Sequence, residues 1–113
     1  MLQSFSFRSG SPSGVDMVFD CRFLKNPNWE GGLKDLNGTD VEVKDYLRKD
    51  ESWEPFNKCL IKMLLTVIPA FEKEGKSYLS IGLGCTGGQH RSVFVAEQLY
   101  KHLEEKSYDV KIY

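Results

Sequence analysis

The sequence contains no apolar run of about 18 residues, the length that a membrane-spanning helix needs, so we expect no membrane span. It also has almost no net charge, since 15 Lys and Arg residues oppose 16 Asp and Glu residues for a formal net of -1. A nucleic-acid-binding domain usually has a basic total or a basic face. The total therefore does not favour nucleic acid as a partner, although it leaves room for a local basic patch.

The cysteines are few and form no CxxC pair. They are Cys21, Cys59 and Cys85, an odd number at wide spacing. This pattern argues against a disulfide framework and against a zinc site. The N-terminus also lacks the charged and then apolar layout of a signal peptide. The reducing cytoplasm is the simplest compartment, and we expect neither a metal nor another cofactor.

What is present is enough apolar sequence for one small folded domain. Hydrophobic residues make up 41% of the 113 residues, which predicts one compact unit with one core. Residues 2–8 and 15–23 have the composition of strands, with a Ser- and Gly-rich loop between them. A third strand is predicted at 78–83, where a short apolar run bounded by glycine is typical of a covered sheet.

Capping residues and apolar spacing predict two helices in the middle of the chain. Thr39 and Glu42 match a capping box, in which the threonine caps a short helix that ends at about residue 49. Ser52 is the expected cap of the next helix, and Pro69 should kink that helix or end it early. The expected core face of this helix recurs at helical spacing: Phe56, Leu60, Met63 or Leu64, Val67 and Phe71.

The C-terminal third predicts a helix over 89–105 and a last strand over 108–113. The apolar stripe of this helix consists of Val93, Ala96, Tyr100 and Leu103. A strand, a helix and a strand form a βαβ unit, whose crossover should be right-handed. The predicted fold class is therefore α/β: one small domain over residues 1–113, with a mostly parallel central sheet, flanking helices and a C-terminal βαβ unit.

The loop between the third strand and the third helix, residues 84–92, carries most of the reactive and charged side chains. Ligands of α/β sheets bind at the carboxyl ends of strands, where the first turn of a helix has free N–H groups that favour an anion. Gly87 and Gly88 let the backbone approach a ligand closely, and Arg91 is a planar fork suited to phosphate oxygens. Further hydrogen-bonding side chains come from Thr86, His90 and Ser92. The loop predicts a phosphate site.

Other interpretations of this loop are a structural turn and a catalytic site. A Walker A loop is excluded, because no lysine follows the second glycine in the required order. A turn that serves packing alone would not need a histidine, an arginine and two hydroxyls together. The C-x-x-G-x-x-R-S spacing resembles the signature of cysteine-dependent phosphatases, with Cys85 as nucleophile and Arg91 holding the phosphate oxygens. The usual histidine before that cysteine is Gly84 here, so a small buried residue at the strand end is the alternative for Cys85.

Three stretches carry a resemblance to a known family: residues 5–10, residues 19–29 with Thr39 and Asp40 after them, and residues 84–99. They resemble the C-terminal domain of the RapZ-type RNase adapter family, whose members are often labelled P-loop nucleotide-binding proteins. The resemblance implies a compact α/β domain similar to a phosphofructokinase subdomain. It also implies a non-catalytic sensory or adapter role, with binding of an amino-sugar phosphate and, in the best-known members, of small RNA and an RNase.

The resemblance also implies a ligand pocket built from two parts of the chain. The matching pocket positions are Arg22, Asn26, Thr86, Gly87, Gly88, His90 and Arg91, with Asp20 and Ser92 as supports. For Asp20 and Arg22 the alternative is an ordinary ion pair at a strand end. For Asn26 the alternative is a turn residue beside proline.

The sequence departs from the family pattern at positions that concern RNA. Gln89 stands where the family usually has lysine, and Asn28 and Ser9 stand where it usually has histidines. The family's N-terminal P-loop domain and basic tail are not in this sequence. Because phosphate contacts dominate RNA affinity, we expect a small phosphorylated molecule rather than RNA as the ligand. We also expect a domain excised from, or partnered with, a larger protein, with a nucleotide-binding or phosphotransferase domain upstream.

Overall fold

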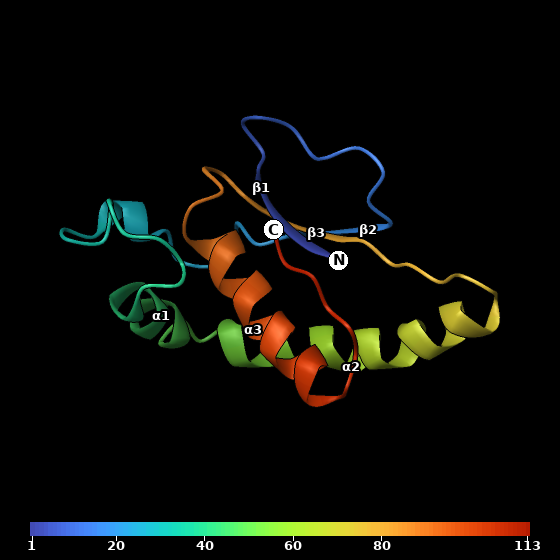
Figure 1. Ribbon diagram of the computed structural model, residues 1–113. Coiled ribbons are helices and arrows are strands. Elements are labelled where there is room, and N and C mark those ends of the chain that lie inside the picture. The colour runs from blue at the N-terminus through green and yellow to red at the C-terminus, as the bar shows by residue number, and fades with distance from the viewer.

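The computed structural model describes residues 1–113 and confirms the predicted α/β class. Its elements, shown in Figure 1, are β1 (Leu2–Ser6), β2 (Met17–Asp20), the 3-10 helix η1 (Pro27–Trp29), α1 (Val41–Arg48), α2 (Trp53–Lys73), β3 (Ile81–Cys85) and α3 (Arg91–Glu105). None of the helices combines the length and the apolar character that crossing a membrane requires.

The sheet has three parallel strands in the order β1-β3-β2. Leu2 of β1 and Met17 of β2 both pair with Ile81, so the carboxyl ends of all strands reach the same edge. All residues of the central strand β3 are buried, as the glycine-bounded apolar run predicts. This strand begins and ends later than the predicted 78–83, and its last residue, Cys85, leads into the loop with the expected anion site.

The second strand is shorter than the sequence predicts, because it ends at Asp20 and not at Phe23. The Cys21 N–H still donates to the Gly84 carbonyl at 2.8 Å, but the Leu24 N–H then donates back to the Cys21 carbonyl at 3.4 Å. This turn moves the chain away from β3.

The predicted last strand is present only as a short pairing beside β1. Leu2 and Ile112 form a single parallel bridge. The Leu2 N–H donates to the Lys111 carbonyl at 2.8 Å, and the Tyr113 N–H donates to the Leu2 carbonyl at 2.9 Å. The path from β3 through α3 to this segment therefore follows the predicted βαβ order, but the final strand is reduced to one bridge.

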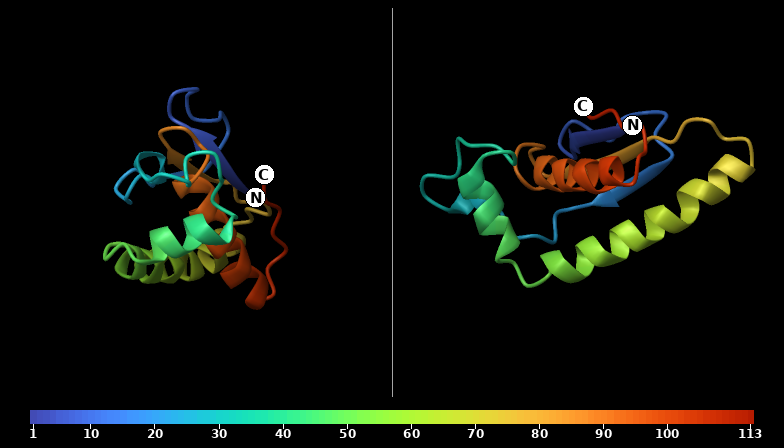
Figure 2. Two further views of the ribbon diagram at one scale, coloured as in Figure 1. Left: turned by 90° about the vertical axis from the view of Figure 1, so that its left-hand side faces the viewer. Right: turned by 60° about the horizontal axis from the view of Figure 1, so that its bottom comes forward.

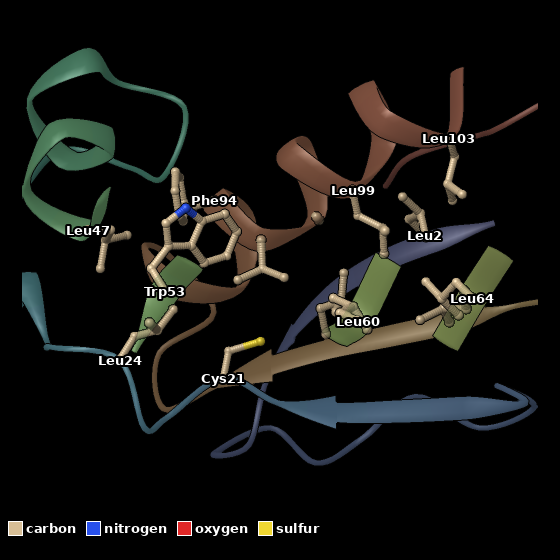
Figure 3. Packing of buried hydrophobic residues seen from close by; sticks show 14 of the residues in the cluster. Leu2, Cys21, Leu24, Leu47, Trp53, Leu60, Leu64, Phe94, Leu99 and Leu103 are labelled. Atoms are coloured by element: carbon tan, nitrogen blue, oxygen red, sulfur yellow. The ribbon is translucent and has the colours of Figure 1, made fainter. Parts of the chain in front are cut away.

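The helices lie on one side of the sheet, and the core fills the space between the two layers (Figures 1 and 2). Figure 3 shows Leu60 and Leu64 of α2 next to Leu2 of β1 and Leu99 of α3. On the opposite face of the sheet, the Phe5 ring covers the glycines of β3. A Cβ added at Gly84 would lie 2.5 Å from that ring, so this close packing requires glycine.

Neither of the two predicted side-chain caps in the middle of the chain is present. Thr39 does not cap α1: the helix begins at Val41 after Asp40, and the Thr39 hydroxyl bonds to the Asn37 side chain instead. The Asp40 carboxylate accepts from the Asn37 N–H at 2.8 Å, which pulls the turn before the helix together. Ser52 does precede α2, but its side chain makes no capping bond. Pro69 does not end α2 early, since the helix continues to Lys73.

The buried face of α3 differs from the predicted stripe. Ala96 and Leu103 are buried as expected, whereas Val93 and Tyr100 are only half-buried. The fully covered apolar residues are Phe94, Val95, Ala96, Leu99 and Leu103. The face is wide because α3 packs on the sheet and also meets the start of α2, where the Trp53 and Phe94 ring centroids lie 4.6 Å apart. In α2, Leu64 rather than Met63 is the buried alternative.

Candidate functional site

A small polar cavity lies where β3 ends and α3 begins, at the edge of the sheet that the sequence predicts. Its volume is about 100 Å³, several times the roughly 10–15 Å³ that one water needs. Its lining residues are Arg8, Asn26, Asn28, Cys85, Thr86, Gly87, Gln89, His90 and Arg91. Three separate segments of the chain therefore meet there: the segment after β1, the start of η1 and the β3–α3 loop.

Arg91 is the central cation of this cavity, and it is 5% exposed. Its guanidinium donates to the Arg22 carbonyl at 2.8 Å, to the Leu24 carbonyl at 3.1 Å and to the Thr86 hydroxyl at 3.2 Å. None of the ion pairs in the structure includes it. The side chain is thus held firmly by neutral acceptors, while its charge has no carboxylate partner.

Asp20 and Arg22 form the ion pair that was the alternative to a ligand role. Arg22 Nη2 lies 2.6 Å from one Asp20 oxygen and Nε lies 2.9 Å from the other, a two-pronged pairing. The Arg22 hydrogen bonds are the main reason that the pKa of Asp20 is lowered. The guanidinium also lies 4.0 Å from the centre of the Phe7 ring. Neither residue lines the cavity, and both are exposed.

The two loop glycines have different surroundings. A Cβ added at Gly87 would meet no atom within 4 Å, so this residue keeps the cavity open beside it. Gly88 has a φ of 68° and lies against the backbone of β1, where an added Cβ would be 3.0 Å from the Phe5 carbonyl carbon. Gly88 is therefore required for packing and conformation rather than for lining the cavity.

The β3–α3 loop is also hydrogen-bonded to residues 33–38, a segment that the sequence does not indicate as part of the site. Gln89 donates through Nε2 to the Lys34 and Leu36 carbonyls, both at 2.7 Å. His90 Nε2 lies 3.0 Å from the Leu33 carbonyl; since a carbonyl only accepts, this contact requires the tautomer with the proton on Nε2. The Gly38 N–H donates to the Gln89 carbonyl at 2.9 Å. These bonds hold the cavity wall in place.

Cys85 is buried at the base of the cavity and contacts the start of α3. Its Sγ lies 3.2 Å from the Ser92 hydroxyl oxygen and accepts from the Ser92 N–H at 3.4 Å. Burial raises the pKa of this thiol, but hydrogen bonds from Ser92 and the Gly88 N–H, together with the charge of Arg91, outweigh it. The net result is a pKa below that of an ordinary cysteine. Ser92 is buried behind the sulfur and does not line the cavity.

The structure brings together five of the predicted ligand residues: Asn26, Thr86, Gly87, His90 and Arg91. It leaves Asp20, Arg22, Gly88 and Ser92 outside the lining. Sequence reasoning missed Arg8, Asn28 and Gln89 as lining residues. The position of Arg8 could have been inferred, because it follows β1 and the carboxyl ends of parallel strands share one edge. No group of three or more His, Cys, Asp and Glu side chains forms a metal site.

Comparison with known proteins finds a family profile and several relatives that match this sequence. The sequence profile described as the RapZ C-terminal domain matches residues 1–113. A protein named "nucleotide-binding protein" from Cereibacter sphaeroides is 54% identical over 109 residues, which is 96% of this chain and 36% of that protein. A protein of the same name from Dinoroseobacter shibae is 50% identical over the same share of this chain, and one from Ruegeria is 50% identical over 98% of it. The chain thus spans little more than a third of these relatives.

Proposed function

The chain belongs to the RapZ C-terminal domain family, and from this membership and its cavity we propose that it is a non-catalytic sensory module for a small phosphorylated molecule. In this proposal the phosphate enters the cavity beside Arg91, and the occupied domain acts on a partner. The observation that carries the proposal is the buried Arg91 guanidinium, which has hydrogen bonds to neutral oxygens but no carboxylate partner.

The electrostatics of the cavity support an anion over a neutral ligand. A hydrogen bond to a charged group contributes about 1.5–3 kcal/mol, more than the roughly 0.5–1.5 kcal/mol of a neutral one. The N-terminus of α3 adds about 0.3–1 kcal/mol for an anion near its first turn. His90 precedes this turn without a side-chain capping bond, and Arg8 supplies a second cation on the cavity wall. A phosphate is therefore favoured by several groups at once.

The remaining lining residues support a phosphate attached to a polar body such as a sugar. Asn26 and Asn28 line the side formed by η1, where their amides can donate to and accept from hydroxyl groups. The cavity volume of about 100 Å³ suits one compact group rather than a polymer strand. Because the relatives are named "nucleotide-binding protein", a nucleotide is tested as a second ligand class. These relatives are almost three times longer than this chain.

Binding is tested by following amide chemical shifts while inorganic phosphate, glucosamine 6-phosphate and AMP are added in turn. The proposal predicts saturable shifts at residues 86–92, with tighter binding of the sugar phosphate than of inorganic phosphate. Arg8→Ala should weaken this binding because it removes an exposed cation from the cavity wall. Arg22→Ala is the matched control, since Arg22 is also exposed but lies outside the lining. No response of the loop to any of these ligands at millimolar concentration would reject the proposal.

A second candidate function is a cysteine-dependent phosphatase. It is favoured by one observation: the Ser92 contacts and the nearby Arg91 lower the pKa of Cys85 despite its burial. In such a reaction the thiolate would attack phosphorus, and the leaving group would need a proton. No carboxyl side chain lines the cavity to supply that proton, which favours binding over turnover. Hydrolysis of p-nitrophenyl phosphate by the native chain, abolished in Cys85→Ser, would establish this alternative.

A further inference from the structure

Two of the free cysteines lie at the ends of neighbouring strands. Asp20 and Gly84 are the last residues that pair β2 with β3, and Cys21 and Cys85 follow them directly. The Cys21 N–H donates to the Gly84 carbonyl at 2.8 Å, so the two segments are still hydrogen-bonded at this point. The third cysteine, Cys59, lies exposed on α2.

The strand geometry suits a bond between these two sulfurs. Neighbouring strands lie about 4.7–4.9 Å apart, and disulfide-linked residues have Cα atoms about 4.4–6.8 Å apart. Equivalent residues of parallel strands also direct their side chains to the same face. Cys21 belongs to the hydrophobic core on the helix side of the sheet (Figure 3), and Cys85 on that side contacts Ser92 of α3.

The environments of the two thiols give them different chemical roles. Cys85 is 2% exposed but is one of the residues that line the polar cavity, so a peroxide that enters this cavity lies next to it. Ser92 and Arg91 also lower the pKa of Cys85, which favours the nucleophilic thiolate. Cys21 is fully buried among apolar side chains. Its pKa is raised to about 12, mainly by this burial and to a smaller extent by the neighbouring Cys85. Cys21 therefore remains a protonated thiol when Cys85 reacts.

We propose that Cys85 is an oxidation site of this protein, and that Cys21 captures the oxidised sulfur as an internal disulfide. The oxidant is hydrogen peroxide. The Cys85 thiolate attacks one peroxide oxygen, the S–O bond forms as the O–O bond breaks, and hydroxide leaves and takes up a proton to give water. The Cys21 sulfur then attacks the sulfenic acid: the S–S bond forms, the S–OH bond breaks, and the Cys21 proton leaves with hydroxide as a second water.

This proposal is independent of which anion the cavity binds, because it depends only on the two cysteines and their access to peroxide. In a reducing cell such a disulfide forms only during oxidative stress and is reversed by thiol reductants, as is usual for disulfides of redox sensors. The disulfide would tie the base of the cavity to the end of β2.

The proposal is tested by exposing the reduced full chain to hydrogen peroxide, unfolding it and blocking the remaining thiols with N-ethylmaleimide. Intact mass should change from three maleimide groups to one, and proteolysis should yield a peptide pair joined through Cys21 and Cys85. Dithiothreitol should restore all three sites. Retention of three maleimide groups would overturn it. So would loss of the maleimide group from Cys59 first, with formation of disulfide-linked dimers.

Two variants separate the roles of the cysteines. Cys59→Ser is the control and should form the same disulfide at the same rate, because Cys59 takes no part. In Cys21→Ala the sulfenic acid on Cys85 has no capturing thiol, so labelling by dimedone should increase severalfold over the native chain. Unchanged dimedone labelling in a folded Cys21→Ala variant contradicts the proposal. Should this variant fail to fold, peptide mapping of Cys59→Ser decides the question alone.

Discussion

At the scale of single residues, the cavity depends on Arg91, whose side chain is held by hydrogen bonds but is not paired with a carboxylate. Arg91 donates to the Arg22 and Leu24 carbonyls, which belong to the turn after β2, and to Thr86 in its own loop. The same side chain therefore closes the turn and directs a positive charge toward the cavity. By contrast, Arg22 is matched to Asp20 on the surface and has no free charge to offer a ligand.

Arg91→Ala should weaken both the fold and the binding of a phosphate. It removes three hydrogen bonds and leaves the buried Leu24 carbonyl and the partly buried Arg22 carbonyl without this donor, which should lower the free energy of unfolding by about 1–3 kcal/mol. Phosphate affinity should fall at least about tenfold, since one charged hydrogen bond contributes that much or more. Urea unfolding and shift titration measure the two effects. An affinity equal to that of the native chain would show that the anion binds elsewhere.

Cys85 should ionise at lower pH than an ordinary cysteine. Because the folded-state pKa lies below the unfolded one, the thiolate stabilises the fold above the unfolded pKa of about 8.5, and this contribution is lost as the pH falls through the folded pKa. The alkylation rate of Cys85 by iodoacetamide, measured in Cys59→Ser, should therefore reach half its maximum at a lower pH than that of a model thiol. Adding phosphate should slow the reaction. A midpoint at or above that of a model thiol would contradict the shift.

At the scale of elements, the loop before α3 is fixed by contacts to the segment before α1. Gln89 and His90 both bond to carbonyls in residues 33–38, and Gly38 packs directly under the start of α3. A Cβ at Gly38 would collide with the His90 carbonyl and the Phe94 N–H. The short irregular segment therefore sets the position of the helix terminus that faces the cavity.

Gly38→Ala should disturb the site from a distance. The added methyl group must displace the first turn of α3, an overpacking that costs about 1–3 kcal/mol of unfolding free energy. Phosphate affinity should fall with it, because His90 and Arg91 move with the turn. Gly31→Ala is the matched control in the same connection, since its Cβ meets no atom within 4 Å. Thermal unfolding and titration of both variants test the prediction; equal behaviour of the two would refute it.

At the scale of the whole molecule, one core and one sheet edge organise the chain. The helices cover a single face of the sheet, and the carboxyl ends of its strands open toward the polar cavity. The formal net charge of -1 gives the chain no overall positive charge. The charge that a ligand meets is therefore local, from Arg8 and Arg91.

Binding of RNA and of a sugar phosphate should respond differently to salt. A strand held by several phosphate contacts loses affinity steeply as salt rises, whereas one buried phosphate is screened much less. We expect no gel-shift complex with single-stranded RNA at 150 mM salt, while glucosamine 6-phosphate still shifts the loop signals. A stable RNA complex at this salt concentration would indicate a basic surface that the charge total does not reveal.

The sequence alone determined the fold class, the three helices and the position of the loop, because periodicity, glycine runs and strand-to-helix order are properties of neighbouring residues. It failed at Thr39, at the end of β2 and at residues 108–113, where contacts with distant residues decide whether a cap or a strand forms. Only the tertiary structure placed Asn28 and Gln89 in the cavity and decided between an ion pair and a ligand role for Asp20 and Arg22. Strand register and the turns of the chain decide which of these residues lie close together, and no local pattern contains that information.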